Sequence, residues 1–301
     1  MLPLRESKQA TSLAPSLHPA VEVGTVTLKV ADLKRSLDYY TQIIGLQPRD
    51  QNASSAVLGA GSRPILLLEE VDGALPQPAN TTGLYHAAIL FPDRRSLARK
   101  IAQLVAKRIS PGYADHLVSE AFYLSDPDGN GLELYRDRPR SEWAWAGKQV
   151  RMASDPIDFD DFFAEIQSEN VETASPLAPD GTKLGHVHLR AADIPLAEAF
   201  YHGVLGFDVT ASMNGALFLS AGGYHHHIGL NTWQSRGGKP PSEPSAGLRE
   251  FSIWLPERAE LERLVKQIQS AGLPVEQGLD SAFVRDPFEN GVRLVVQGAG
   301  G

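Results

Sequence analysis

The chain has 301 residues, of which 42% are hydrophobic and 21% are charged, and this is the composition of a folded globular protein. Its formal net charge of −8 argues against nucleic acid or an anionic membrane as the main partner. The absence of cysteine excludes disulfides, thiolate metal sites and cysteine nucleophiles, and it suits a cytoplasmic protein. Any transition-metal site must therefore use imidazole and carboxylate ligands.

The N-terminal residues 1–19 lack the charged start and the apolar core of a secretion signal, so we expect a flexible leader. No apolar run in the chain approaches the roughly 20 residues that a membrane-spanning helix needs.

Two stretches of the chain, 24–47 and 185–208, align without a gap. Each begins with the period-two alternation of a strand. In the first stretch Asp32 then stands where a helix N-cap belongs, and apolar residues follow at helical spacing up to Gly45. The alignment therefore predicts an internal repeat that starts with a strand and a helix.

A second pair of stretches matches as well, since 83–101 aligns with 247–265 and 125–135 aligns with 285–295. The latter two contain a DP…NG turn between strand-like segments, which is typical of a tight hairpin.

Together these repeats predict four modules, each made of a strand, a helix and about three strands. The modules cover about 20–72, 82–137, 183–233 and 247–297. We expect an N-terminal domain at 20–137 and a C-terminal domain at 183–297. A linker with a short helix, 138–182, joins them.

Paired βαβββ modules resemble the vicinal oxygen chelate superfamily of glyoxalases, bleomycin-resistance proteins and extradiol dioxygenases. The runs SEAFYLSDPDGNGLELYRDRPR, GHVHL and SAGGYHHHIGLNTW resemble its Bacillus-type catechol 2,3-dioxygenase branch. The resemblance implies an α+β fold in which the modules pair into two cupped half-barrel sheets. A cup of this kind holds a divalent metal ion.

In extradiol dioxygenases of this superfamily the metal ligands are two first-strand histidines from paired modules and one last-strand glutamate. The resemblance places these ligands at His86, His186 and Glu133. Two imidazoles and one carboxylate are the ligands of non-haem Fe(II) oxygenases, and Mn(II) is the alternative metal. Because side chains two residues apart share a strand face, His188 is the rival of His186.

Three further residues match positions that act on the substrate in extradiol enzymes. Tyr123 matches a tyrosine that hydrogen-bonds the bound phenolate, and His116 matches a histidine beside the oxygen site. His226 matches the acid–base histidine. If the HHH run is a strand, its neighbours His225 and His227 face away from the site.

These residues come from both halves of the chain, so modules two and three have to pair. Pairing within one chain is our expectation, and a swap between chains is the alternative. Modules one and four would then form a cup without a metal, because Thr25 and Arg293 occupy ligand positions there.

The predicted function is extradiol ring cleavage of catechol or a substituted catechol with O2 at a mononuclear non-haem Fe(II) site. The alternatives are a hydroquinone-type ring-cleaving dioxygenase, a glyoxalase-like metal isomerase and a metal-free protein that binds aromatic drugs. A glyoxalase would need a second carboxylate at the fourth ligand position, where the sequence indicates histidines. Phe122, Tyr224 and Trp233 are candidates for the wall of a substrate pocket. The sequence leaves open whether the protein forms a homo-oligomer.

Overall fold

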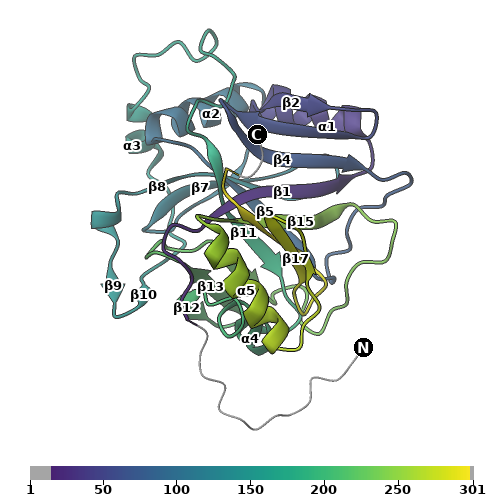
Figure 1. Cartoon of the computed structure of the whole chain (residues 1–301). Coiled ribbons are helices and arrows are strands. Elements are labelled where there is room, and N and C mark those ends of the chain that lie inside the picture. Colours follow the sequence, from purple (N-terminus) through teal and green to yellow (C-terminus); the bar gives the residue numbers. More distant parts are fainter. Residues whose placement is uncertain (1–14, 299–301) are drawn as a thin grey trace.

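The computed structural model of the protein describes residues 15–298 (Figure 1). The predicted leader therefore lies outside the described residues except for 15–19, where Leu17 is buried.

The four modules have the predicted order of strand, helix and three strands. Module one contains β1 (Glu22–Val30), α1 (Leu33–Tyr39), the π-helical turn η1 (Tyr40–Ile44), β2 (Gln47–Gln51), β3 (Ser55–Ala60) and β4 (Arg63–Glu70). Module two contains β5 (Gly83–Leu90), α2 (Arg94–Ala106), β6 (Gly112–Asp115), β7 (Ser119–Ser125) and β8 (Gly131–Asp137). Module three contains β11 (Lys183–Arg190), α4 (Ile194–Tyr201), β12 (Asp208–Met213), β13 (Ala216–Ser220) and β14 (Ile228–Asn231). Module four contains β15 (Gly247–Leu255), α5 (Arg258–Ser270), β16 (Glu276–Gln277), β17 (Ser281–Arg285) and β18 (Gly291–Val296).

The local signals behave as the sequence predicts. The Asp32 side chain caps α1 by accepting a hydrogen bond from the backbone N–H of Arg35 at 2.9 Å. At the other end Gly45 has φ +92°, a left-handed conformation that L side chains rarely adopt.

Two eight-stranded sheets join the modules across the two halves of the chain. One sheet has the order β16-β17-β18-β15-β1-β4-β3-β2, so it combines modules four and one. The other has the order β12-β13-β14-β11-β5-β8-β7-β6 and combines modules three and two. Antiparallel pairing of β11 with β5 forms its centre. The predicted α+β fold of paired βαβββ modules is confirmed, and modules two and three pair within the chain.

The two modules of each half of the chain belong to different sheets, but a side-chain hydrogen bond nevertheless joins them. In Figure 1, α1 and α2 lie at the top of the molecule and α4 and α5 lie at the bottom, while strands of both sheets run between them. The hydroxyl of Tyr40, from module one, donates to Asp126 in the β7–β8 turn of module two at 2.9 Å. Tyr201 donates in the same way to Asp286 at 2.9 Å. Each half therefore has one buried tyrosine–aspartate bond that ties its two modules together.

We expect Tyr40→Phe to lower the free energy of unfolding by about 1.5 kcal/mol, because the variant loses a buried hydrogen bond to a carboxyl group. Urea denaturation measures this change. Tyr39→Phe is the matched control, since the neighbouring Tyr39 hydroxyl has no hydrogen-bond partner within residues 15–298. An equal loss in both variants would contradict a specific role for the Tyr40–Asp126 bond.

A continuous hydrophobic core packs the helices against the sheets. On β5 the core receives Ala87 and Ile89, and on β11 it receives Val187 and Leu189. Because strand side chains alternate, the residues between them project from the opposite face of the same sheet. That face carries the polar residues of the candidate site.

The segment between modules two and three is folded. It contains the 3₁₀ turn η2 (Arg140–Glu142), the hairpin β9 (Trp145–Ala146) and β10 (Gln149–Val150), and the helix α3 (Phe159–Ala164). A β-bridge between Asp115 and Asp155 attaches it to module two. Among the helices that the structure describes, none has the length and apolar character needed to cross a membrane.

Candidate active site

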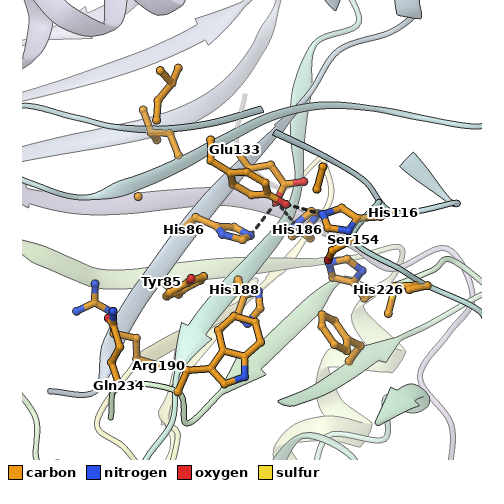
Figure 2. A pocket seen from close by; sticks show the side chains of 18 of the residues that line it. Tyr85, His86, His116, Glu133, Ser154, His186, His188, Arg190, His226 and Gln234 are labelled. Atoms are coloured by element: carbon orange, nitrogen blue, oxygen red, sulfur yellow. Dashed lines mark hydrogen bonds and ion pairs between the residues drawn. The ribbon is translucent and has the colours of Figure 1, made fainter. Parts of the chain in front are cut away.

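The site is centred on the junction of β5 and β11 in the sheet of modules two and three. His86 on β5, Glu133 on β8 and His186 on β11 are all buried, and their ligand atoms lie within 4.8 Å of one another. Oε2 of Glu133 is 2.8 Å from Nε2 of His86 and 3.2 Å from Nε2 of His186. Figure 2 shows these three side chains pointing toward one another. The structure thus brings together all three predicted ligands.

The electrostatics of these residues favour an ionised carboxylate beside a neutral imidazole. Burial alone would raise the pKa of the Glu133 carboxyl, but His186 and His86 beside it outweigh burial and hold the pKa well below its ordinary value. Burial lowers the pKa of His186 to about 4, against the opposing effect of Glu133. A metal ion needs these forms, because it binds an ionised carboxylate and neutral imidazole.

The hydrogen bonding of the site also fits a metal ion. Although Nε2 of His86 is close to Glu133, it is not aligned for a hydrogen bond and has no hydrogen-bond partner in the described part of the chain. Nδ1 of His186 is also buried without a partner there, but the His186 nitrogen that faces Glu133 is Nε2, so only the His86 atom bears on the metal. Buried nitrogen atoms rarely lack partners in folded proteins. Two imidazoles and one carboxylate around a shared point form a donor set that suits a divalent transition metal.

His188 lies beside this group and makes a different bond. Nδ2 of Asn231 donates to Nε2 of His188 at 2.9 Å, and Oδ1 of Asn231 accepts from the backbone N–H of Trp233 at 3.2 Å. The second bond fixes the orientation of the Asn231 amide. Nε2 of His188 therefore already accepts a hydrogen bond and is not free to bind a metal ion.

The fourth ligand position is occupied by Gly229, and the expectation of histidines there is wrong. Glu133 pairs in the sheet with Ala88, two residues after His86. In module three the residue two positions after His186 is His188, and it pairs with Gly229. A Cβ atom on Gly229 would lie 3.0 Å from Nδ1 of His188. Glycine thus leaves room for the His188 ring, and no side chain from this position reaches the centre.

His116 and Tyr123 form a hydrogen-bonded pair on the side of β7. Tyr123 is directly opposite Glu133 in the β7–β8 ladder, and His116 lies in the β6–β7 loop. Nδ1 of His116 is 2.6 Å from the carbonyl oxygen of Ala153, which can only accept. Because His116 donates from Nδ1, we assign its Nε2 as the acceptor for the Tyr123 hydroxyl, 2.5 Å away. Burial, with a contribution from Glu133, raises the pKa of Tyr123, so its hydroxyl stays protonated.

The HHH run lies in the loop before β14, not in the predicted strand. His226 nevertheless faces the site, with its ring centroid 4.1 Å from that of His186. His225 and His227 point elsewhere, as expected. Nε2 of His225 is 2.8 Å from Asp137, and Nδ1 of His227 is 3.1 Å from the Ser220 hydroxyl. Burial lowers the pKa of His226 well below its ordinary value, so the ring is neutral.

One cavity of about 510 Å³, within the range of small-molecule sites, is lined by the three candidate ligands and by His116, Tyr123, His188 and His226. In Figure 2, His116 and His226 lie on one side of the three candidate ligands, and Tyr85, Arg190 and Gln234 lie further away on the other. Trp233 lines the cavity as predicted. Phe122 and Tyr224 do not, because Phe122 packs against Phe162 and Tyr224 packs against His225.

The segment from Met152 to Ser154 also lines the cavity, and the sequence did not indicate it. The sequence presents 138–182 only as a connection, yet the Ala153 carbonyl fixes the His116 ring. Asn231 was missed as well. A polar residue that ends a buried strand beside a histidine-rich loop is a signal that could have found it.

The sheet of modules one and four, here called the second cup, has an ion pair at positions that correspond to the candidate metal ligands. Arg293 and Glu250 occupy the places of Glu133 and His86, and they are joined by two hydrogen bonds of 2.5 and 2.7 Å. Thr25, which corresponds to His186, contacts the hydroxyl of Ser252. The positive guanidinium thus neutralises the carboxylate that could otherwise attract a cation.

We expect a single metal ion per chain, because the described residues contain one group of clustered ligands. The double variant Glu250→Gln, Arg293→Met should keep the metal content of the unmodified protein. Elemental analysis of anaerobically purified protein measures this. A second equivalent of metal, or a loss of metal in the double variant, would contradict the assignment of the second cup.

With this geometry in view, the chain can be assigned to a class. Residues 22–134 and 183–294 match the glyoxalase/bleomycin resistance protein/dioxygenase superfamily, and the chain belongs to this superfamily. It is 42% identical to catechol-2,3-dioxygenase of Bacillus subtilis. The alignment spans 278 residues and covers 90% of this chain and 96% of that protein. It is also 32% identical over 115 residues to biphenyl-2,3-diol 1,2-dioxygenase 3 of Rhodococcus globerulus, covering 36% of this chain and 60% of that protein.

Solved structures support the fold. A Bacillus subtilis crystal structure aligns with a TM-score of 0.64 over 95% of this chain and 87% of that chain, at 14% identity. Glyoxalase I from Zea mays aligns with a TM-score of 0.55 over 92% of each chain, at 18% identity. At these identities the likeness extends to the fold alone.

Proposed function

We propose that the protein is an extradiol dioxygenase that cleaves the ring of catechol or a substituted catechol with O2 at a mononuclear non-haem Fe(II) site, with Mn(II) as the alternative metal. The observation that carries the proposal is the convergence of His86, Glu133 and His186 in a cavity that also contains a neutral histidine and a protonated tyrosine. The similarity to the Bacillus subtilis catechol-2,3-dioxygenase over most of the chain supports it.

In this proposal His86, Glu133 and His186 hold the metal ion, and His188 does not, because its Nε2 already accepts from Asn231. Bound Fe(II) would hold the diol and dioxygen together and let electron density pass between them.

The neighbouring side chains have separate proton and hydrogen-bonding roles. His226 is neutral, so its ring can accept the proton of a substrate hydroxyl and return it later. The Tyr123 hydroxyl has one proton, which it donates to His116 in this structure, so it can stabilise a substrate oxyanion by turning that hydrogen bond from His116 to the substrate. His116 orients that hydroxyl through the 2.5 Å contact, and the Ala153 carbonyl fixes the His116 ring.

Gly229 weighs against the glyoxalase-like alternative. That reaction would require a second carboxylate at the position which Gly229 occupies, and a side chain there would press on His188. Within the described residues, Glu133 is the only carboxylate in the group of candidate metal ligands. Ring cleavage therefore fits the donor set better than isomerisation does.

The test uses full-length protein purified without oxygen and loaded with Fe(II). We expect catechol and O2 to be consumed in equal amounts, with formation of a yellow ring-opened semialdehyde. Hydroquinone and a hemithioacetal, as substrates of the alternative reactions, should not be turned over. Conversion of either one in place of catechol, or tight catechol binding without metal and without turnover, would overturn the proposal.

A cytoplasmic location remains a prediction, and fractionation of cells that produce the protein tests it. The sequence leaves the formation of a homo-oligomer open, and light scattering during size-exclusion chromatography decides it.

A further inference from the structure

We infer that His225 and Asp137 are positioning residues for His226. In this inference they fix the tautomer of His226 in which Nδ1 carries the proton and Nε2 is free to accept one. The inference rests on the proposed function, in which His226 takes a proton from the substrate. Neither His225 nor Asp137 lines the cavity, so both act through His226.

A chain of two short contacts leads from Asp137 to His226. Oδ1 of Asp137 is 2.8 Å from Nε2 of His225, and Nδ1 of His225 is 2.8 Å from Nδ1 of His226. The other nitrogen of His226, Nε2, makes no hydrogen bond within the described residues, and its ring lines the cavity.

The proton positions follow from the donor and acceptor capacity of each group. An ionised carboxylate can only accept, so Nε2 of His225 carries a proton. The contact between the two rings needs one donor and one acceptor, and because His225 donates from Nε2, we assign its Nδ1 as the acceptor and place the proton on Nδ1 of His226. A neutral His226 with a proton on Nδ1 has its lone pair on Nε2. Through two successive hydrogen bonds, the carboxylate of Asp137 thus determines which nitrogen of His226 is basic.

Packing holds the intermediate ring in place. His225 is fully buried, between Tyr224 with a ring-centroid distance of 4.1 Å and Trp143 at 5.1 Å. The Tyr224 hydroxyl donates to Oδ1 of Asp137 at 3.2 Å, and Tyr135 is 2.8 Å from that hydroxyl. Water therefore does not compete at His225, and hydrogen bonds away from water constrain geometry more strongly than exposed ones.

The same arrangement helps when the proton is transferred. The substrate O–H bond breaks and an N–H bond forms at Nε2, which leaves a positive charge on His226. The Nδ1–H of this imidazolium donates more strongly to His225, and the Asp137 carboxylate at the far end offsets the charge. No further reactant is needed, and the step reverses when the proton returns to the product.

The neighbouring His227 provides a matched control. It is a buried histidine of the same loop, and its Nδ1 contacts the Ser220 hydroxyl at 3.1 Å and accepts from the Ala221 N–H at 3.2 Å. It lines a second cavity together with Glu22 and Lys183, and it does not contact His226 through a hydrogen bond. Replacement of His225 and of His227 by Phe removes a similar number of hydrogen bonds, so a difference between them reports the link to His226.

The first test measures the tautomer directly in metal-free, ¹⁵N-histidine-labelled protein. Long-range ¹H–¹⁵N spectra identify the protonated ring nitrogen, and comparison with His226→Phe assigns the His226 signals. We expect the Nδ1–H form in the unmodified protein and in His227→Phe, and a shift toward the Nε2–H form in His225→Phe. An Nε2–H form of His226 in the unmodified protein would overturn the inference.

The second test is steady-state kinetics with Fe(II)-loaded protein. We expect His225→Phe to lower kcat roughly 10- to 100-fold, by analogy with the cost of losing a group that orients a metal-ligating histidine, with little change in KM or metal content. His225→Asn should recover part of the loss, because its amide oxygen can accept from Nδ1 of His226.

The outcomes separate the inference from the proposed function. If the unmodified protein cleaves catechol but His225→Phe is as active, or His227→Phe is equally impaired, the positioning role is wrong and the enzyme assignment stands. If the unmodified protein shows the Nδ1–H tautomer but no turnover, the proposed function is wrong.

Discussion

Replacement of Glu133 by Gln is expected to remove the bound metal and abolish ring cleavage. The carboxylate is the only anionic member of the ligand group, and it lies between the nitrogens of His86 and His186. Loss of a group that merely orients a metal ligand costs roughly 10- to 100-fold in affinity, so loss of a direct ligand should cost more. Gln has the same shape as Glu, so the buried site keeps its packing. Titration of metal-free protein with Fe(II) measures the affinity, and catechol turnover measures the activity.

The matched control for this prediction is His188→Ala. His188 lies on the same face of β11 as His186 but bonds to Asn231, so the variant should retain its metal. Loss of metal in His188→Ala with retention in His186→Ala would exchange the roles of the two histidines. Full metal content in Glu133→Gln would show that this group of ligands is not the metal site.

The internal repeat made most of the fold predictable. Strand alternation, the cap at Asp32 and the turn glycine at Gly45 are local features, and each appears in the structure as predicted. The order of strands in the sheets, in contrast, is not a local feature. It depends on the contact of β5 with β11, which lie about a hundred residues apart, and no local pattern in either strand encodes that partner. The pairing of modules two and three could be predicted from the sequence only because His86, Glu133 and His186 had to meet, and pairing within one chain was favoured because the linker 138–182 could reach around a cup.

The candidate site was predictable where a residue stands on a repeated strand position, as His86, Glu133 and His186 do. It was not predictable where a contact depends on loop geometry. The HHH run follows the fold of a loop, and only the structure shows that His225 reaches Asp137, 88 positions away in the sequence. One signal was available: Glu133 and Asp137 lie on the same face of β8, because they are separated by an even number of residues.

Replacement of His226 by Phe should leave the metal and catechol binding intact but lower kcat by roughly 10²- to 10⁴-fold, the usual effect of losing an acid–base group. His226 lies next to His186 but is not part of the ligand group, and Phe fills a similar volume beside Phe218. The binding of substrate should therefore change little, and the loss should appear in kcat and not in KM.

Steady-state kinetics on metal-loaded protein, together with metal analysis, checks this prediction, and His227→Phe serves as the control for a buried histidine of the same loop. A loss of metal in His226→Phe would mean that His226 contributes to the ligand group after rearrangement. Normal turnover in His226→Phe would assign the proton step to His116, which also lines the cavity. In that case His116→Phe should produce the loss, because the proton of the substrate would then pass to the pair formed by His116 and Tyr123.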